Sequence, residues 1–130
     1  MLKVALGQVV SAGTAQHLNN TFLLEDGQPL PIGGKTGTGD NRIVTSTSRG
    51  YKTSSRAISR TATFVFYLGD HHFGILTAFV TGSSAENFSF TSALPLQVMK
   101  GMAPILLPEV RRAAQGAIAR ESSGIPIAPN

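Results

Sequence analysis

Seven consecutive positions, Gly33 to Gly39, contain one lysine, two threonines and four glycines. A lysine ammonium and threonine hydroxyls bind oxyanions, and glycines let a strand backbone approach a ligand closely. An apolar residue, Ile32, precedes these positions, and a turn-forming pair, Asp40-Asn41, follows them. The composition predicts a strand edge that binds an anion, and three kinds of protein use similar sequences for that purpose.

Two of these kinds are excluded by single residues. A phosphate-binding P-loop requires a glycine, any four residues, and then Gly-Lys-Ser/Thr. Its first glycine would fall at Pro29, and no helical pattern follows Thr36. In the cation-pump ATPases, the aspartate that is phosphorylated directly precedes Lys-Thr-Gly-Thr, but that position is Gly34 here, which has no carboxylate.

The length, charge and composition of the chain further limit the classes of function that it can have. A chain of 130 residues forms one domain around one core. Eleven Lys and Arg against seven Asp and Glu give a formal charge of +4, which attracts anionic partners without specifying one. The absence of cysteine excludes disulfides and thiolate metal sites, and we expect neither a metal nor a cofactor. No apolar run approaches the roughly 20 residues that span a bilayer.

Apolar spacing predicts the elements that position the glycine-rich stretch. Residues 2–12 form an amphipathic helix that ends at Gly13, and residues 91–107 form a second helix after candidate capping residues that include Thr91. Runs of β-branched and aromatic residues separated by a turn predict a β-hairpin. Together with the glycine-rich stretch, this gives three strands, at about 32–38, 61–68 and 73–80.

Both faces of the last predicted strand are apolar. One face carries Phe73, Ile75 and Phe79, and the other carries Leu76 and Val80. Such a strand requires cover on both sides, and the chain has few helices to provide it. We expect an α+β fold in which the N- and C-terminal helices pack on one face of an antiparallel sheet, while the other face and one edge stay bare.

The segment at 42–60 is polar, with five cationic residues and no acidic one. A nucleic-acid-binding arm has such a charge but also carries interleaved aromatic residues, and Tyr51 is alone here. We expect a solvated loop or a hairpin flap. The histidines are expected to be structural, since His71 and His72 are neighbours at a predicted turn without a third metal ligand, and His17 stands alone.

Four features follow the order found in the C-terminal part of penicillin-binding transpeptidase domains, which belong to the serine β-lactamase-like superfamily. They are a helix ending in Val9-Val10-Ser11-Ala12-Gly13-Thr14-Ala15, the sequence Gly34-Lys35-Thr36-Gly37-Thr38-Gly39, an antiparallel hairpin, and a closing helix with Ala93-Leu94-Pro95-Leu96. The chain is most similar to the bifunctional glycosyltransferase/transpeptidase proteins of peptidoglycan synthesis, which Gly39-Asp40-Asn41-Arg42 and Arg60-Thr61-Ala62-Thr63 resemble. The resemblance covers residues 1–107; residues 108–130 are expected to form a short helix at 109–120 and a disordered tail.

This resemblance implies a partial β-lactamase/transpeptidase-like fold and a role for each residue of the Lys-Thr-Gly strand. Lys35 is the implied catalytic residue, which holds the carboxylate of a D-alanyl-D-alanine peptide or β-lactam and helps relay a proton. Thr36 and Thr38 offer hydroxyls to the same anion, and the Thr38 amide is an oxyanion-hole donor. Gly34 and Gly37 leave room for the substrate. A structural strand with a surface lysine remains the alternative.

Two motifs that the family's chemistry requires are missing. None of the four lysines has a serine three positions before it, so Ser-x-x-Lys is absent, and no asparagine completes Ser-x-Asn. Without an activated nucleophile no acyl-enzyme forms. The resemblance therefore implies the C-terminal piece of a D,D-transpeptidase that is inactive alone, with the missing motifs on an upstream segment that covers the bare sheet face.

The expected partners follow from this interpretation. They are a peptidoglycan stem peptide or β-lactam and either the missing transpeptidase segment or a second copy that covers the exposed sheet. No nucleic acid and no membrane contact by this segment are expected. The implied location is periplasmic or extracytoplasmic, within a protein anchored in the inner membrane. Two alternatives stay open: a binding module for cell-wall peptides that lacks a nucleophile, and a basic domain that binds an anionic polymer through 42–60.

Overall fold

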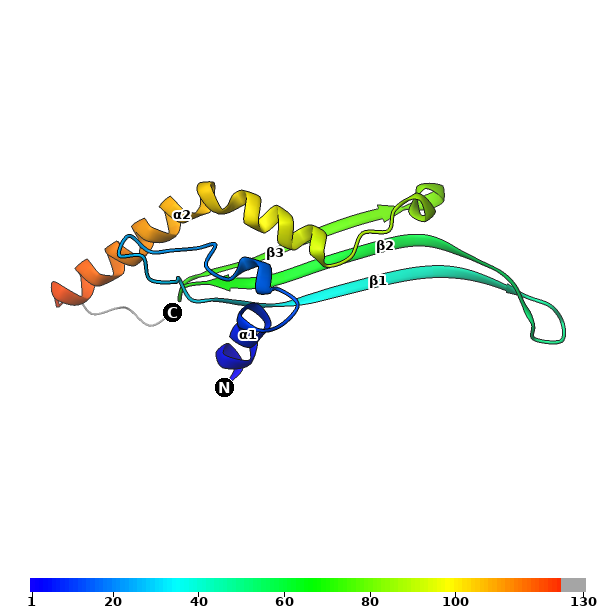
Figure 1. The fold of residues 1–130 in the computed structure, drawn as a ribbon, viewed down its shortest axis with the longest axis horizontal. Helices are drawn as coiled ribbons and strands as arrows, with labels where there is room; N and C mark the ends of the chain where they lie inside the picture. The colour runs from blue at the N-terminus through cyan, green and yellow to red at the C-terminus, as the bar shows by residue number, and fades with distance from the viewer. Residues whose placement is uncertain (125–130) are drawn as a thin grey trace.

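The computed structural model describes residues 1–124, apart from the side chains of Ala117 and Glu121. Its strands form one antiparallel sheet in the order β1-β2-β3, with helices packed against it (Figure 1). The predicted α+β class is thereby confirmed. The elements are α1 (Leu2–Ser11), η1 (Gln16–Leu18), β1 (Ile32–Ser46), β2 (Lys52–Leu68), β3 (His72–Thr81), η2 (Gly82–Asn87) and α2 (Ala93–Ser122).

The hairpin of β1 and β2 is much longer than predicted, because both strands continue through the basic segment. Of the two forms expected at 42–60, the hairpin flap is correct and the solvated loop is wrong. Hydroxyl pairs join its strands, as between Thr45 Oγ1 and Ser54 Oγ at 2.7 Å. A turn closes the hairpin, in which Gly50 adopts a φ of 81°. Because β3 ends opposite Ser59, whose partner on β1 is Asn41, residues 42–58 form a two-stranded projection, here called the arm (Figure 1).

The strand register assigns each side chain to one of two sheet faces. Lys35 lies opposite Val65, which lies opposite Ile75, and these three share what we call the open face. Gly34, Phe66 and Gly74 are likewise aligned and belong to the other face, the core face. Alternation along the strands therefore places Lys35 and Thr36 on opposite faces of β1.

The hydrophobic core lies between the core face and α2. Phe64 and Leu68 of β2 and Met99 of α2 are almost fully buried. Phe64 stacks on Phe66 with a centroid distance of 5.5 Å. The connector between α1 and β1 also enters this core, and Arg111 ties it to α2 by donating two hydrogen bonds to the Leu23 carbonyl at 3.2 and 2.6 Å. The connector residues in the core are Ala15, Leu18, Phe22 and Leu30.

The helix α1 packs on the open face, so the expectation that both long helices share one face is wrong in this respect. A side chain at Gly33, an open-face position, would meet the Leu6 backbone and the Tyr67 ring. Tyr67 in turn donates a hydrogen bond to the Lys3 carbonyl at 3.2 Å. Gly33 allows this close approach, and the connector then passes the edge of β1 to reach the core face. Figure 1 shows α1 beside β1 and α2 along the β3 side.

The open face is bare along β3, as expected. Its apolar side chains are largely accessible, at 74% for Phe73, 66% for Ile75, 62% for Phe79 and 45% for Val65. An isolated surface leucine is ordinary, but four neighbouring apolar side chains on adjacent strands are typical of a surface that another element covers. Among residues 1–124, only α1 packs on this face, at the Tyr67 end.

The helix α2 differs from its prediction at its C-terminal end. It begins after Thr91, whose hydroxyl accepts the Ala93 N–H at 3.3 Å, and it continues through Pro104 and Pro108 to Ser122. The separate short helix at 109–120 is therefore wrong: apolar packing of Val110 against the core keeps the helix continuous past both prolines. The disordered tail was predicted to begin at residue 121, which is too early because the helix continues to Ser122. Residues 125–130 lie outside the described residues. No helix in residues 1–124 combines the length and apolarity that crossing a bilayer requires.

Replacing Lys3 by methionine is expected to raise the pKa of Asp70 toward that of an ordinary carboxyl group. The Lys3 ammonium donates to Asp70 Oδ1 at 2.7 Å, and this hydrogen bond and its charge lower the pKa. Since the folded state has the lower pKa, the pair stabilises the fold above the unfolded pKa, and this effect is lost as the pH falls through the folded pKa. An NMR titration of Asp70 measures the shift, and an identical pKa in both proteins would exclude the contact.

Candidate functional site

The outer edge of β1 presents free backbone groups at alternate residues. The Gly69 N–H donates to the Pro31 carbonyl at 2.7 Å, so residues 31 and 69 form a hydrogen-bonded pair. Hydrogen-bonded pairs recur at every second residue of an antiparallel ladder. Lys35 and Gly37 lie an even number of positions after Pro31, so they direct their N–H and C=O groups toward β2. Thr36 and Thr38 therefore direct theirs outward, to an edge that no described strand covers.

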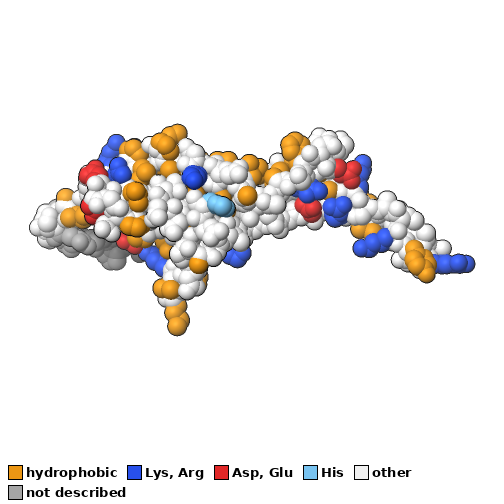
Figure 2. Space-filling model, in the orientation of Figure 1, with side chains coloured by type: hydrophobic (Ala, Val, Ile, Leu, Met, Phe, Trp, Pro, Cys, Tyr) orange, Lys and Arg blue, Asp and Glu red, His pale blue; other side chains and the backbone are white. Residues whose placement is uncertain are grey.

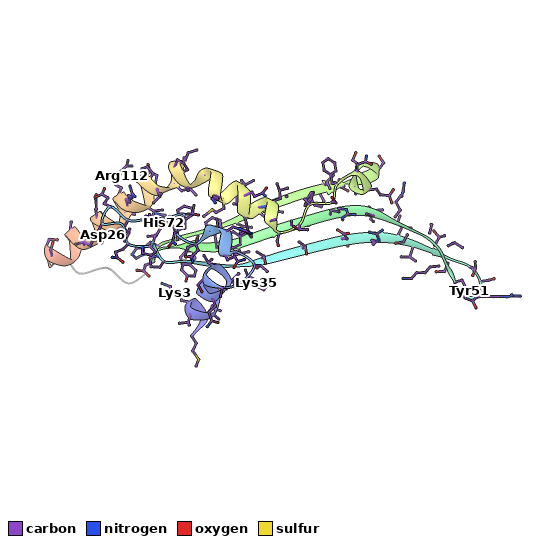
Figure 3. All side chains as sticks on the ribbon, in the orientation of Figure 1. Lys3, Asp26, Lys35, Tyr51, His72 and Arg112 are labelled. Carbon is purple, nitrogen blue, oxygen red and sulfur yellow. The ribbon has the colours of Figure 1, made fainter. Side chains whose placement is uncertain are left out.

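Lys35 stands at this edge with its side chain exposed on the open face (Figure 3). Its ammonium donates to the outward carbonyl of Thr36 at 2.6 Å. In the described part of the chain, no carboxylate lies within salt-bridge distance of it. An ammonium has three donors, so two remain to bind an anion placed along the edge.

The two threonines approach the same edge from the core face. The Thr36 hydroxyl lies 3.0 Å from the hydroxyl of Thr14, which follows α1 in the chain. Thr38 is exposed. The edge therefore offers an ammonium on one side, hydroxyls on the other, and the Thr38 N–H between them. No role was predicted for Thr14 from the sequence. Its position directly after Gly13, where the first helix was predicted to end, indicated only that it lies in the connector that follows this helix.

The two glycines named from the sequence have different surroundings. A Cβ at Gly34 would lie 2.3 Å from the Val65 carbonyl oxygen and 2.6 Å from the Phe64 ring. Packing within the chain is thus enough to explain Gly34, which is buried. A Cβ at Gly37 would meet no atom within 4 Å. Nothing inside the described chain requires a glycine there, so Gly37 lies beside open space.

Other candidate chemistry does not gather at this edge. In residues 1–124, no three His, Cys, Asp or Glu side chains are close enough to hold a metal ion. His71 lies in the β2–β3 turn, His72 is the first residue of β3, and His17 lies in η1. No hydrogen bond found in the described residues links Lys35 or Thr36 to a histidine or carboxylate. The edge can therefore bind and orient an anion, and it holds no activated nucleophile.

No protein-family model matches the chain, and comparisons with curated proteins and with solved structures also found no match.

Proposed function

We propose that the edge from Gly34 to Gly39 is one wall of a D,D-transpeptidase active site that binds D-alanyl-D-alanine stem peptides and β-lactams. The observation that supports the proposal best is the convergence at one unpaired strand edge of the Lys35 ammonium, the threonine hydroxyls and the outward N–H of Thr38. These are the groups that a peptide carboxylate and a developing oxyanion require.

The geometry suggests how the substrate is held. An extended peptide adds to the β1 edge as a further strand, bonded to the outward N–H and C=O groups of Thr36 and Thr38. Its terminal carboxylate then lies near Lys35 and the hydroxyls, which fix its position by charge. The Thr38 N–H provides one oxyanion-hole donor, and Gly37 keeps a side chain away from the bound peptide. Lys35 also relays a proton to the leaving amine.

The proposal assigns the nucleophile to a segment outside this sequence. That segment carries Ser-x-x-Lys and Ser-x-Asn and covers the apolar open face, which residues 1–124 leave bare beside Lys35. We propose an extracytoplasmic location, as part of a protein anchored in the inner membrane, and chemistry that needs no cofactor. The chain alone is then a binding half-site.

Incubation of the 130-residue chain with a fluorescent penicillin tests this assignment. The expected result is no covalent labelling, because acylation requires an activated serine that the chain lacks. A complete penicillin-binding protein labelled in parallel shows that the reagent is active. Covalent labelling of the chain would contradict the proposal that the nucleophile lies elsewhere.

A second candidate is a free-standing binding module for cell-wall peptides. The exposed state of Lys35 and Thr38 favours it, since both are accessible without any further segment. The two candidate functions predict different affinities for a D-Ala-D-Ala peptide. A module that acts alone binds the peptide tightly, whereas a half-site binds it weakly. The dissociation constant of the isolated chain therefore separates them.

A further inference from the structure

The net positive charge of the chain is concentrated in and beside the arm. Five of the eleven Lys and Arg and one of the seven Asp and Glu lie at residues 40–60. The remaining six cationic residues are matched by six acidic ones, so this region carries the whole formal charge of +4. Figure 2 shows blue side chains along the arm and at its end.

Most of the cations on the arm have no acidic partner. Asp40, at the base, lies 3.6 Å from Arg42 and 3.5 Å from Arg60. Further out are Arg49, Lys52 and Arg56, for which the described residues provide no salt bridge. Every residue from 41 to 56 is exposed. An isolated two-stranded hairpin without a core is marginally stable in water, so a bound partner would add order that the chain does not supply.

The distribution of the cations favours an extended polymer over a flat membrane. Arg56 lies opposite Ile43 on one face of the arm, while Arg42 lies on the other face with Val44. Both faces are thus cationic, and the exposed aliphatic side chains are split between them instead of forming one apolar side. Tyr51 alone lies at the tip (Figure 3), so the series of stacking platforms that nucleic-acid bases require is missing.

We infer that the arm binds a linear polyanion of repeating phosphate groups without bases, such as inorganic polyphosphate. The arm extends roughly 25 Å at the rise of a β-strand, long enough to contact several successive charges. Its cations bind the phosphates by charge, and its Ser and Thr hydroxyls donate hydrogen bonds. The inference does not depend on the proposed function, because the arm tip lies far from Lys35 (Figure 3).

Binding of the 130-residue chain to inorganic polyphosphate, measured between 50 and 200 mM salt, tests the inference. With three phosphate contacts, affinity is expected to fall about 20-fold over this range. The triple variant Arg49→Gln, Lys52→Gln, Arg56→Gln loses this salt dependence and at least tenfold in affinity at 50 mM salt. The matched control Lys100→Gln, Arg112→Gln, Arg120→Gln removes the same charge from α2 and is expected to keep both the affinity and its salt dependence.

Several outcomes would overturn the inference. Equal losses in the two triple variants would show attraction by net charge alone. Tighter binding to single-stranded DNA than to polyphosphate, with dependence on Tyr51, would indicate nucleic acid. Binding to anionic phospholipid vesicles but not to polyphosphate would indicate a membrane. Circular dichroism of each variant confirms that the fold is kept.

Discussion

Replacement of Gly34 by alanine is expected to lower the free energy of unfolding by about 3 kcal/mol, the upper part of the usual range for overpacked sites. The added Cβ would lie 2.3 Å from the Val65 carbonyl oxygen and 2.6 Å from the Phe64 ring. The carbonyl belongs to the central strand and the ring is fully buried, so neither can move without disturbing the core. Urea denaturation measures the change.

Gly37 provides the matched control three residues away on the same strand. Its added Cβ would meet no atom within 4 Å, and the expected change in the free energy of unfolding from Gly37→Ala is within about 0.5 kcal/mol. The same substitution is expected to weaken peptide binding, since its methyl group occupies space beside the outward groups of Thr36 and Thr38. Similar stability losses at both glycines would contradict the packing described for Gly34.

Replacement of Lys35 by methionine is expected to weaken binding of a D-Ala-D-Ala peptide by about 10- to 100-fold. This corresponds to the loss of one charged hydrogen bond, about 1.5–3 kcal/mol. The side chain is exposed and its only hydrogen bond in the described residues goes to the neighbouring Thr36 carbonyl, so the fold is expected to be unaffected.

Isothermal titration calorimetry provides the dissociation constants for this comparison. Lys100→Met removes an equal charge from an exposed position of α2 and is expected to leave the affinity unchanged. If Lys100→Met weakened binding as much as Lys35→Met, general electrostatic attraction would account for the effect, and the assignment of Lys35 as the carboxylate-binding residue would fail.

The predictable parts of the fold are those where burial leaves a pattern in the sequence. The two long helices repeat apolar residues at helical spacing, and runs of β-branched and aromatic residues mark the hairpin at 61–80. The structure contains all three elements. The glycine-rich strand was also placed correctly at its start, Ile32. The bare sheet face was predictable because the last strand is apolar on both faces, and one layer of helices covers only one of them.

The errors occurred where local signals and packing disagree. The arm is exposed on both sides, so no alternation indicated how far its strands extend, and cross-strand hydroxyl pairs such as Thr45 with Ser54 stabilise it instead. Pro108 is a helix-breaking signal that packing of Val110 overrides. The position of α1 depended on Gly33 and Tyr67, far apart in sequence, which together form its packing surface.

For the candidate site, the sequence indicated which residues to consider but not their geometry. The composition at 33–39 predicted an anion-binding strand edge, and the structure places Lys35, Thr36 and Thr38 at an unpaired strand edge. The contact of Thr14 with Thr36 depends on the path of the connector, which no sequence period encodes. The different reasons for Gly34 and Gly37 also required the positions of their neighbours.

The central claim, that the edge from Gly34 to Gly39 binds a peptide carboxylate, is tested most directly by NMR titration of the isotope-labelled chain with a D-Ala-D-Ala peptide. We predict saturable amide shifts confined to the residues around Lys35 and Thr38, and no such shifts with the same peptide carrying a C-terminal amide. Equal shifts with both peptides, or shifts elsewhere in the chain and none at this edge, would contradict the claim.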